Sequence, residues 1–90
     1  MTERRSLLIE GLVQGVGFRW YARETARRLN VLGWVRNLPN GQVEAQAEGP
    51  PETLKKFIEE LKTGLPFARV DSISEKVIPA NGERDPFDIY

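Results

Sequence analysis

The segment LLIEGLVQGVGFRWYARETARRLN (residues 7–30) predicts a strand, a loop with two glycines and a helix in direct succession. Residues 7–13 are mostly apolar, as in a short buried strand. After the loop, apolar and small side chains recur every three or four positions, which places them on one face of a helix: Phe18, Tyr21, Ala22, Thr25, Ala26 and Leu29. Asn30 follows, and asparagine tolerates the left-handed backbone that ends many helices.

A hairpin comes next. Residues 33–38 predict a strand, and the tetrapeptide LPNG (38–41) predicts a turn, because proline, asparagine and glycine suit its successive positions. Apolar and polar side chains alternate over residues 42–48, which indicates a half-buried strand antiparallel to the one before it. The inward-facing residues of this strand are predicted to be Val43, Ala45 and Ala47.

The remaining pattern completes a known arrangement. Residues 51–63 predict a helix that begins with prolines and ends at Gly64, and residues 70–78 and 87–90 predict two further strands. The order β-α-β-β-α-β with a short extra strand predicts one α+β domain over residues 1–90 with a ferredoxin-like, split βαβ fold. Both helices should cover one face of a mostly antiparallel sheet with the first and third strands in the middle. The place of the short last strand stays open.

Composition restricts the chemistry and the partners. Histidine and cysteine are absent, which excludes Ser-His-Asp and Cys-His nucleophilic sites and zinc sites built on these residues. Basic and acidic residues balance at 13 each, so the positive excess of a nucleic-acid module is lacking and no nucleic-acid partner is expected. No stretch is typical of a signal peptide or of a membrane span. We therefore expect a cytoplasmic protein without a membrane partner, and a monomer.

The glycine loop itself matches neither common nucleotide-binding motif. A dinucleotide fingerprint needs glycine where the chain has Trp20, and a Walker loop needs a lysine, which first occurs at Lys55. One interpretation is a tight turn. The other is an anion site, because glycines let successive N–H groups converge at the positive end of the helix. Arg19 favours the anion site, since a cation in the first helical turn is unfavourable unless an anion lies beside it.

The other arginines of this region have a simpler explanation. Five arginines and one glutamate fall between residues 14 and 40, which suits a small anionic ligand. For Arg27 and Arg28 we expect a solvated helix face. For Arg19 the alternative to ligand binding is an ion pair with a carboxylate such as Glu48 or Asp88.

Two stretches of the chain resemble signatures of the acylphosphatase family. VQGVGFR (residues 13–19) matches the first signature, and GWVRNLPNGQVE (residues 33–44) matches the second, with Asn40 where the family usually has aspartate. The resemblance extends over nearly the whole chain. It implies that the phosphoryl group is bound by the Arg19 side chain and by the loop amides, and that Asn37 positions the attacking water. The binding residues so implied are Gly15, Val16, Gly17, Phe18 and Arg19.

The implied reaction is hydrolysis of an acyl phosphate to a carboxylate and inorganic phosphate. A carboxylate leaves without a general acid, and loose phosphoryl transfer needs mainly positioning and charge stabilisation, so amides, one arginine and an oriented water suffice. We therefore expect no metal and no cofactor, and we interpret Glu10 and Glu44 as sheet-face residues rather than magnesium ligands. Inorganic phosphate or sulfate should bind the loop and inhibit.

Three alternatives share this fold class. An RNA-recognition module would carry aromatic residues on its first and third strands, and the corresponding strands here have none. A small-molecule regulatory module would not need both Arg19 and Asn37. An acylphosphatase-like part of a hydrogenase-maturation carbamoyltransferase would need a much longer chain with zinc-finger cysteines.

Overall fold

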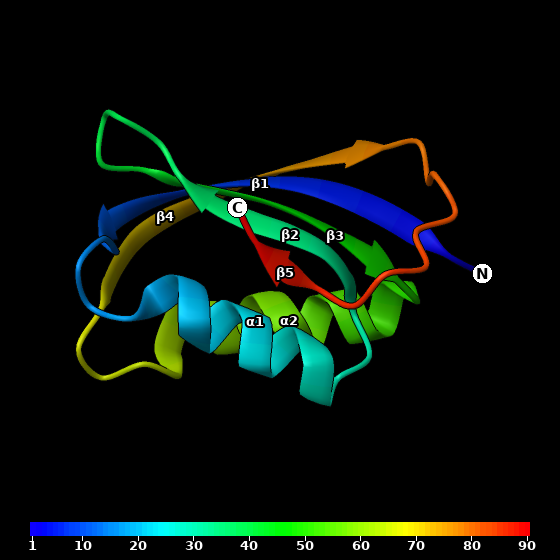
Figure 1. Ribbon diagram of the computed structural model, residues 1–90, viewed down its shortest axis with the longest axis horizontal. Coiled ribbons are helices and arrows are strands. Elements are labelled where there is room, and N and C mark those ends of the chain that lie inside the picture. Colours follow the sequence, from blue (N-terminus) through cyan, green and yellow to red (C-terminus); the bar gives the residue numbers. More distant parts are fainter.

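Two layers make up the molecule, a five-stranded sheet and two helices packed on one of its faces (Figure 1). The computed structural model describes residues 1–90. In chain order the elements are β1 (Glu3–Leu12), α1 (Phe18–Arg28), β2 (Leu32–Asn37), β3 (Val43–Gly49), α2 (Pro51–Thr63), β4 (Arg69–Ile78) and β5 (Asp88–Ile89). The predicted ferredoxin-like order is confirmed. Neither α1 nor α2 has the length and hydropathy that a bilayer span requires.

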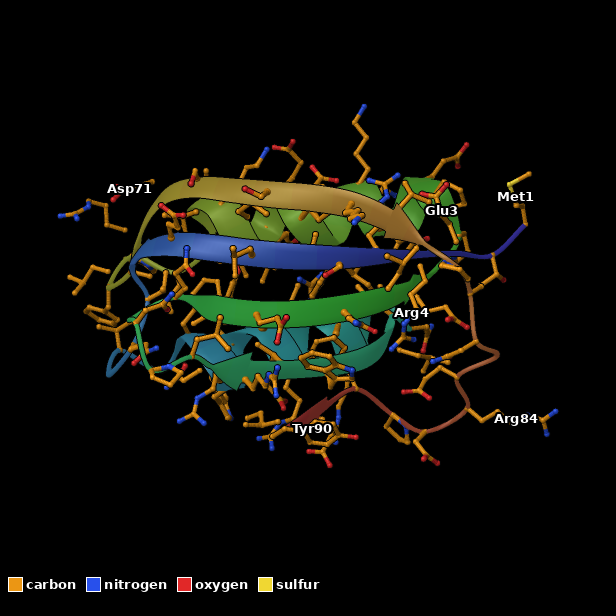
Figure 2. The ribbon with its side chains drawn as sticks, turned by 90° about the horizontal axis from the view of Figure 1, so that it is seen from above. Met1, Glu3, Arg4, Asp71, Arg84 and Tyr90 are labelled. Atoms are coloured by element: carbon orange, nitrogen blue, oxygen red, sulfur yellow. The ribbon has the colours of Figure 1, made fainter.

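The strands lie side by side in the order β4-β1-β3-β2-β5, which Figure 2 shows from the open face of the sheet. β1 pairs antiparallel with both β3 and β4, and β3 pairs antiparallel with β2. β1 and β3 are therefore central, as predicted. β5, whose place the sequence left open, runs parallel to β2 at the edge, and the N–H of Tyr90 extends the pairing by donating to the Val35 carbonyl at 2.8 Å.

β1 is longer than predicted at its beginning and irregular near its end. It starts at Glu3 rather than at residue 7, because Arg4 lies opposite Glu48 of β3 and the two side chains form a buried ion pair. The register with β4 shifts between Glu10 and Gly11. A Cβ on Gly11 would lie 1.9 Å from the carbonyl oxygen of Arg69, so the close approach of the two strands requires glycine there.

The core lies between the sheet and the helices and fixes the start of α1. The apolar inward residues of β1 and β3, including the predicted Val43, Ala45 and Ala47, are fully buried in one cluster with residues of both helices. Phe18, the first residue of α1, is 1% exposed and belongs to this core. Because Phe18 is anchored, the loop before it and Arg19 after it are held at the same end of the sheet.

α2 ends at the predicted residue. Gly64 is the C-cap, and its N–H donates to the Glu60 carbonyl. Its backbone is right-handed, so left-handed geometry is not the reason for glycine. A Cβ on Gly64 would lie 1.7 Å from the hydroxyl oxygen of Tyr21, which itself donates to the Glu60 carbonyl, so glycine makes room for the contact between α1 and α2.

Candidate active site

The loop between β1 and α1 owes its shape to two glycines. Gly15 and Gly17 have φ values of 76° and 80°, in the left-handed region that other residues seldom adopt. Nothing lies within 4 Å of a Cβ built on either residue, so backbone conformation and not crowding requires glycine. Gly17 is the N-cap of α1, no side chain caps the helix, and its first turn contains no acid. The positive end of the helix is thus left without a negative group of the chain.

A small hollow of about 210 Å³ opens at this helix start. It contains all but one of the residues that the sequence analysis assigned to binding or catalysis. Its walls come from the loop, from the first turn of α1, and from the ends of β2 and β5: Val13, Gly15, Gly17, Phe18, Arg19, Trp20, Asn37 and Ile89. Val16 is the exception, because its half-buried side chain packs against the core. A role for its backbone amide stays a prediction.

Arg19 forms no hydrogen bond and no ion pair within the protein. Every other arginine except Arg84 donates to an oxygen of the chain. The two carboxylates considered as alternative partners are bound elsewhere, since Glu48 pairs with Arg4 and Asp88 accepts from the backbone N–H of Ile89. Arg19 is therefore a cation without a counter-charge at the positive end of a helix. This arrangement is unfavourable unless an anion binds.

Asn37 lines the same hollow and has an unpaired side-chain atom. It is the last residue of β2, and its Oδ1 is the one buried side-chain polar atom that lacks a hydrogen-bond partner. Leaving such an atom unpaired costs about 1–3 kcal/mol, and native proteins seldom tolerate it outside functional sites.

Gln14 joins the glycine loop to the hairpin that carries Asn37. Its Nε2 donates to the carbonyl oxygens of Leu38 and Gln42, both at 2.8 Å. These bonds fix the distance between the two halves of the site. The sequence analysis gave no role to Gln14, because its partners lie more than twenty residues away in sequence. It also gave none to the wall residues Val13, Trp20 and Ile89.

The turn after Asn37 has the predicted geometry. The N–H of Gly41 donates to the Leu38 carbonyl at 3.2 Å, and Gly41 has a φ of 94°. The Oδ1 of Asn40 accepts from the N–H of Gln42 at 3.0 Å, a bond that an aspartate would also form.

The carboxylates considered as metal ligands are engaged on the sheet. Glu10 accepts from the side chain of Gln42, and Glu44 pairs with Arg36 on the neighbouring strand. The structure contains no group of three or more histidine, cysteine, aspartate or glutamate side chains arranged to hold a metal ion.

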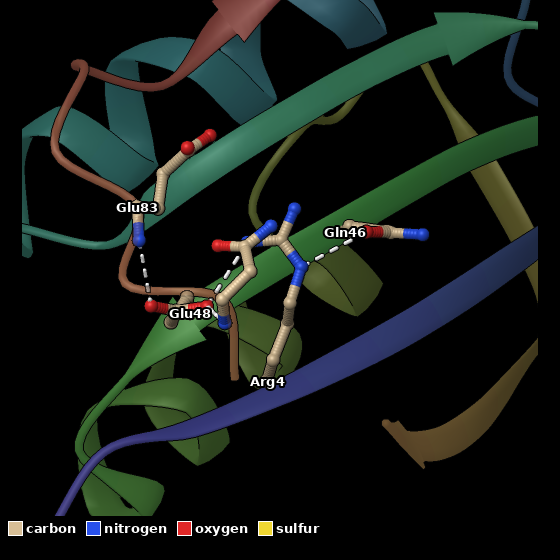
Figure 3. Close-up of polar contacts among 5 residues, drawn as sticks. Arg4, Gln46, Glu48 and Glu83 are labelled. Atoms are coloured by element: carbon tan, nitrogen blue, oxygen red, sulfur yellow. Dashed lines mark hydrogen bonds and ion pairs between the residues drawn. The ribbon is translucent and has the colours of Figure 1, made fainter. Parts of the chain in front are cut away.

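The opposite end of β1 and β3 holds a second arginine beside backbone N–H groups (Figure 3). There the carboxylate of Glu48 accepts from Arg4 at 3.1 Å and from the N–H groups of Asn81 and Glu83, each at 3.0 Å. Arg4 also donates from Nε to Gln46 at 2.9 Å. Burial by itself would raise the pKa of Glu48, but the hydrogen bonds from Asn81, Arg4 and Glu83 outweigh it, and the pKa lies below its ordinary value.

Arg27 and Arg28 are exposed, as expected for a solvated helix face, and each also has a partner in the protein. Arg27 donates to the carbonyl oxygen of Phe87 at 3.0 Å and so ties α1 to the segment before β5. Arg28 forms an ion pair with Glu60 of α2. The face is solvated as predicted, and its two arginines in addition connect α1 to the C-terminal segment and to α2.

Larger hollows lie elsewhere on the surface. The largest described, about 700 Å³, lies beside α2 and is lined mainly by charged residues such as Lys55 and Glu59. None of these larger hollows contains a residue of the glycine loop or Asn37. Size therefore does not identify the site, whereas the coincidence of a free cation and an unpaired acceptor does.

Comparison with known proteins identifies the family. A family model of acylphosphatase matches residues 5–89. An acylphosphatase of Thermococcus kodakarensis is 52% identical over 73 residues, which are 81% of this chain and 80% of that protein. The crystal structure of acylphosphatase from Bacillus subtilis is 37% identical, with a TM-score of 0.92 that covers 100% of this chain and 99% of that one. Full-length HypF in its phosphate- and nucleotide-bound form is 27% identical, with a TM-score of 0.87, and the match covers 100% of this chain but 12% of that one. The chain belongs to the acylphosphatase family and is a hydrolase of that type.

Proposed function

We propose that the protein hydrolyses acyl phosphates in the hollow at the start of α1. The phosphoryl oxygens accept hydrogen bonds from the backbone N–H groups of residues 15–19 and from the guanidinium of Arg19. The observation that carries this proposal is that Arg19, which has no partner in the chain, and Asn37, whose Oδ1 is unpaired, line the same hollow at an uncapped helix start. An anion and a water would satisfy both groups at once.

In the proposed reaction Asn37 accepts a hydrogen bond from a water molecule and directs its oxygen at phosphorus. The new bond joins this oxygen to phosphorus, and the bond from phosphorus to the acyl oxygen breaks. The electron pair of that bond leaves with the carboxylate, and the proton of the water passes to solvent. Asn37 orients the water and does not act as a base, because a neutral amide does not take up a proton at ordinary pH.

The proposed mechanism uses no metal ion. A carboxylate is a good leaving group, so the enzyme has only to position the reactants and to stabilise negative charge on the phosphoryl oxygens. Arg19 and the helix start supply positive charge for this purpose. A phosphate monoester leaves as an alkoxide and needs an acid or a metal, so such monoesters should be poor substrates.

One set of assays tests the proposal. Acetyl phosphate and benzoyl phosphate are incubated with enzyme that has been treated with EDTA, with glycerol 3-phosphate, which would leave as an alkoxide, as the monoester control. We expect both acyl phosphates to be hydrolysed, the monoester to be left nearly intact, and added magnesium to change little. Absence of acyl phosphate hydrolysis overturns the activity. Loss of most activity in EDTA with recovery in magnesium overturns the metal-free mechanism.

Further properties belong to the same proposal. Inorganic phosphate and sulfate should inhibit competitively, because the loop and Arg19 recognise the anion rather than the acyl group. We also propose that residues 1–90 act as one domain, as a cytoplasmic monomer, without a nucleic-acid partner. Light scattering of the purified protein measures its molar mass and so tests whether it is a monomer.

A further inference from the structure

An exposed tryptophan lies directly beside the proposed phosphoryl site. Trp20 follows Arg19 in the first turn of α1, lines the same hollow, and is 57% exposed. The other tryptophan, Trp34, has a partner, since its ring stacks on Tyr90 with the centroids 6.0 Å apart. Trp20 belongs to neither of the aromatic pairs of the structure. Its indole is thus a large apolar surface that the fold leaves available.

The hollow around Trp20 differs in character from the other hollows. Half of its lining residues are hydrophobic, Arg19 is its one charged residue, and it contains no acid. The hollows beside α2 are instead lined mainly by lysines and glutamates. A cation next to apolar walls fits a ligand with an anionic end and an apolar end. Ile89 of β5 adds a second apolar surface to that of Trp20.

The in-line geometry of phosphoryl transfer determines on which side of the phosphorus atom the acyl group lies. Phosphoryl transfer places the attacking and leaving oxygens roughly in line on opposite sides of phosphorus. Asn37 belongs to β2 and Trp20 to α1, so the two side chains reach the hollow from different elements. If Asn37 holds the water, the acyl group extends away from Asn37.

We propose that Trp20 determines the acyl specificity of the site by packing its indole against the acyl group. This inference rests on the proposed function. It assigns to the enzyme a preference for acyl phosphates whose acyl group is flat and apolar, such as an aromatic ring, over acetyl phosphate. Aromatic pairs stabilise contacts enough to change affinity by roughly two- to tenfold beyond simple burial.

The kinetic test compares benzoyl phosphate with acetyl phosphate in wild type, Trp20→Ala and Trp20→Phe. The quantity measured is the ratio of kcat/KM for the two substrates. Trp20→Ala should lower the benzoyl-to-acetyl ratio by roughly two- to tenfold, and Trp20→Phe should restore most of it. Phe67→Ala is the matched control, because Phe67 is a 76% exposed aromatic residue that does not line the hollow. An unchanged ratio in Trp20→Ala overturns the inference, even if both rates fall.

A binding test separates this inference from the proposed activity. Phenylphosphonate and methylphosphonate are stable, and calorimetry measures their affinities without any turnover. Wild type should bind phenylphosphonate more tightly than methylphosphonate, and Trp20→Ala should lose the difference. If no acyl phosphate is hydrolysed but this difference appears and depends on Trp20, the activity fails and the apolar subsite stands. Equal affinity of wild type for both phosphonates overturns the subsite.

Discussion

The two ends of the central strands β1 and β3 each offer an arginine and backbone N–H groups to a negative charge. At one end Arg4 and the N–H groups of Asn81 and Glu83 surround the carboxylate of Glu48, which is 3% exposed. At the other end Arg19 and the uncapped start of α1 face a hollow where the chain places no acid. The chain itself supplies the negative charge at the first end and supplies none at the second.

This difference separates a structural anion site from a binding site. Where the chain supplies its own carboxylate, the charges are paired and buried, and removing one of them should destabilise the fold. Where the chain supplies none, the free cation and the unpaired Asn37 oxygen cost stability, and an external anion recovers it. Breaking the Arg4–Glu48 pair should therefore lower the stability of the protein, whereas substitution of Arg19 should lower its activity.

The largest effect is expected for Arg19→Ala. It removes the charged fork from the phosphoryl group, and kcat/KM for benzoyl phosphate should fall by about 10³-fold or more, as for other arginines that stabilise transferring phosphoryl groups. Phosphate inhibition should weaken as well. Arg19→Lys should restore little, because a lysine is a point charge without the planar fork. Arg84→Ala is the control, since Arg84 also has no partner in the chain but does not line the hollow. Equal losses in both variants would contradict the assignment.

At the other end, Glu48→Gln should destabilise the protein without a direct effect on catalysis. It leaves the Arg4 charge buried without a counter-charge, which costs about 3–5 kcal/mol of unfolding free energy. Glu44→Gln removes an ion pair whose arginine is half exposed and should cost about 0–1 kcal/mol. Chemical denaturation of both variants measures the difference. Similar costs would show that the two ion pairs do not differ in the way the structure indicates.

Asn37→Ala should separate turnover from binding. Loss of one preorganised hydrogen-bonding group should lower kcat by about 10²–10³-fold, whereas phosphate inhibition should stay within a few-fold. The variant should melt at or above the parent temperature, because it removes an unpaired buried oxygen. A folded variant that keeps more than about a tenth of the parental kcat would contradict the role of Asn37. Loss of phosphate binding with kcat intact would instead assign the phosphoryl group to Asn37 and the water to Arg19.

A smaller effect is expected from pH. The pKa of Glu48 is lowered in the folded protein, so below its ordinary value of 4.5 the unfolded chain binds more protons than the folded one. The stabilisation by Glu48 is therefore complete above about pH 4.5 and is lost as the pH falls through the folded value. The gap in unfolding free energy between wild type and Glu48→Gln should shrink below that pH. A gap that is constant from pH 7 to pH 3 would contradict the lowered pKa.

Much of the fold could be predicted because local patterns and tertiary contacts agree. The helix periodicity, the alternation in β3 and the turn at residues 38–41 each correspond to observed elements. The beginning of β1 was missed, since Arg4 looks like a solvent-exposed residue until Glu48 is placed opposite it. The attachment of β5 was not predictable either, because two residues carry too little pattern to select an edge.

The candidate site was predictable in part for a similar reason. Glycines before a helix and an arginine in its first turn have local physical meaning, and the family resemblance supplied Asn37. The role of Gln14 depends on carbonyl groups more than twenty residues away in sequence, and no local pattern reveals such a bond. Trp20 was read only as the residue that breaks a glycine motif, since its exposure and its place in the hollow require the tertiary structure.

The most direct test of the central claim is a crystal structure of the protein grown with inorganic phosphate. The account predicts one phosphate at the start of α1, held by backbone N–H groups of residues 15–19 and by Arg19, and none beside Arg4, where Glu48 already fills the equivalent place. The thermal stability should rise with phosphate in wild type and not in Arg19→Ala. Phosphate found instead at the exposed face of Arg27 and Arg28, with the loop empty, would contradict the account.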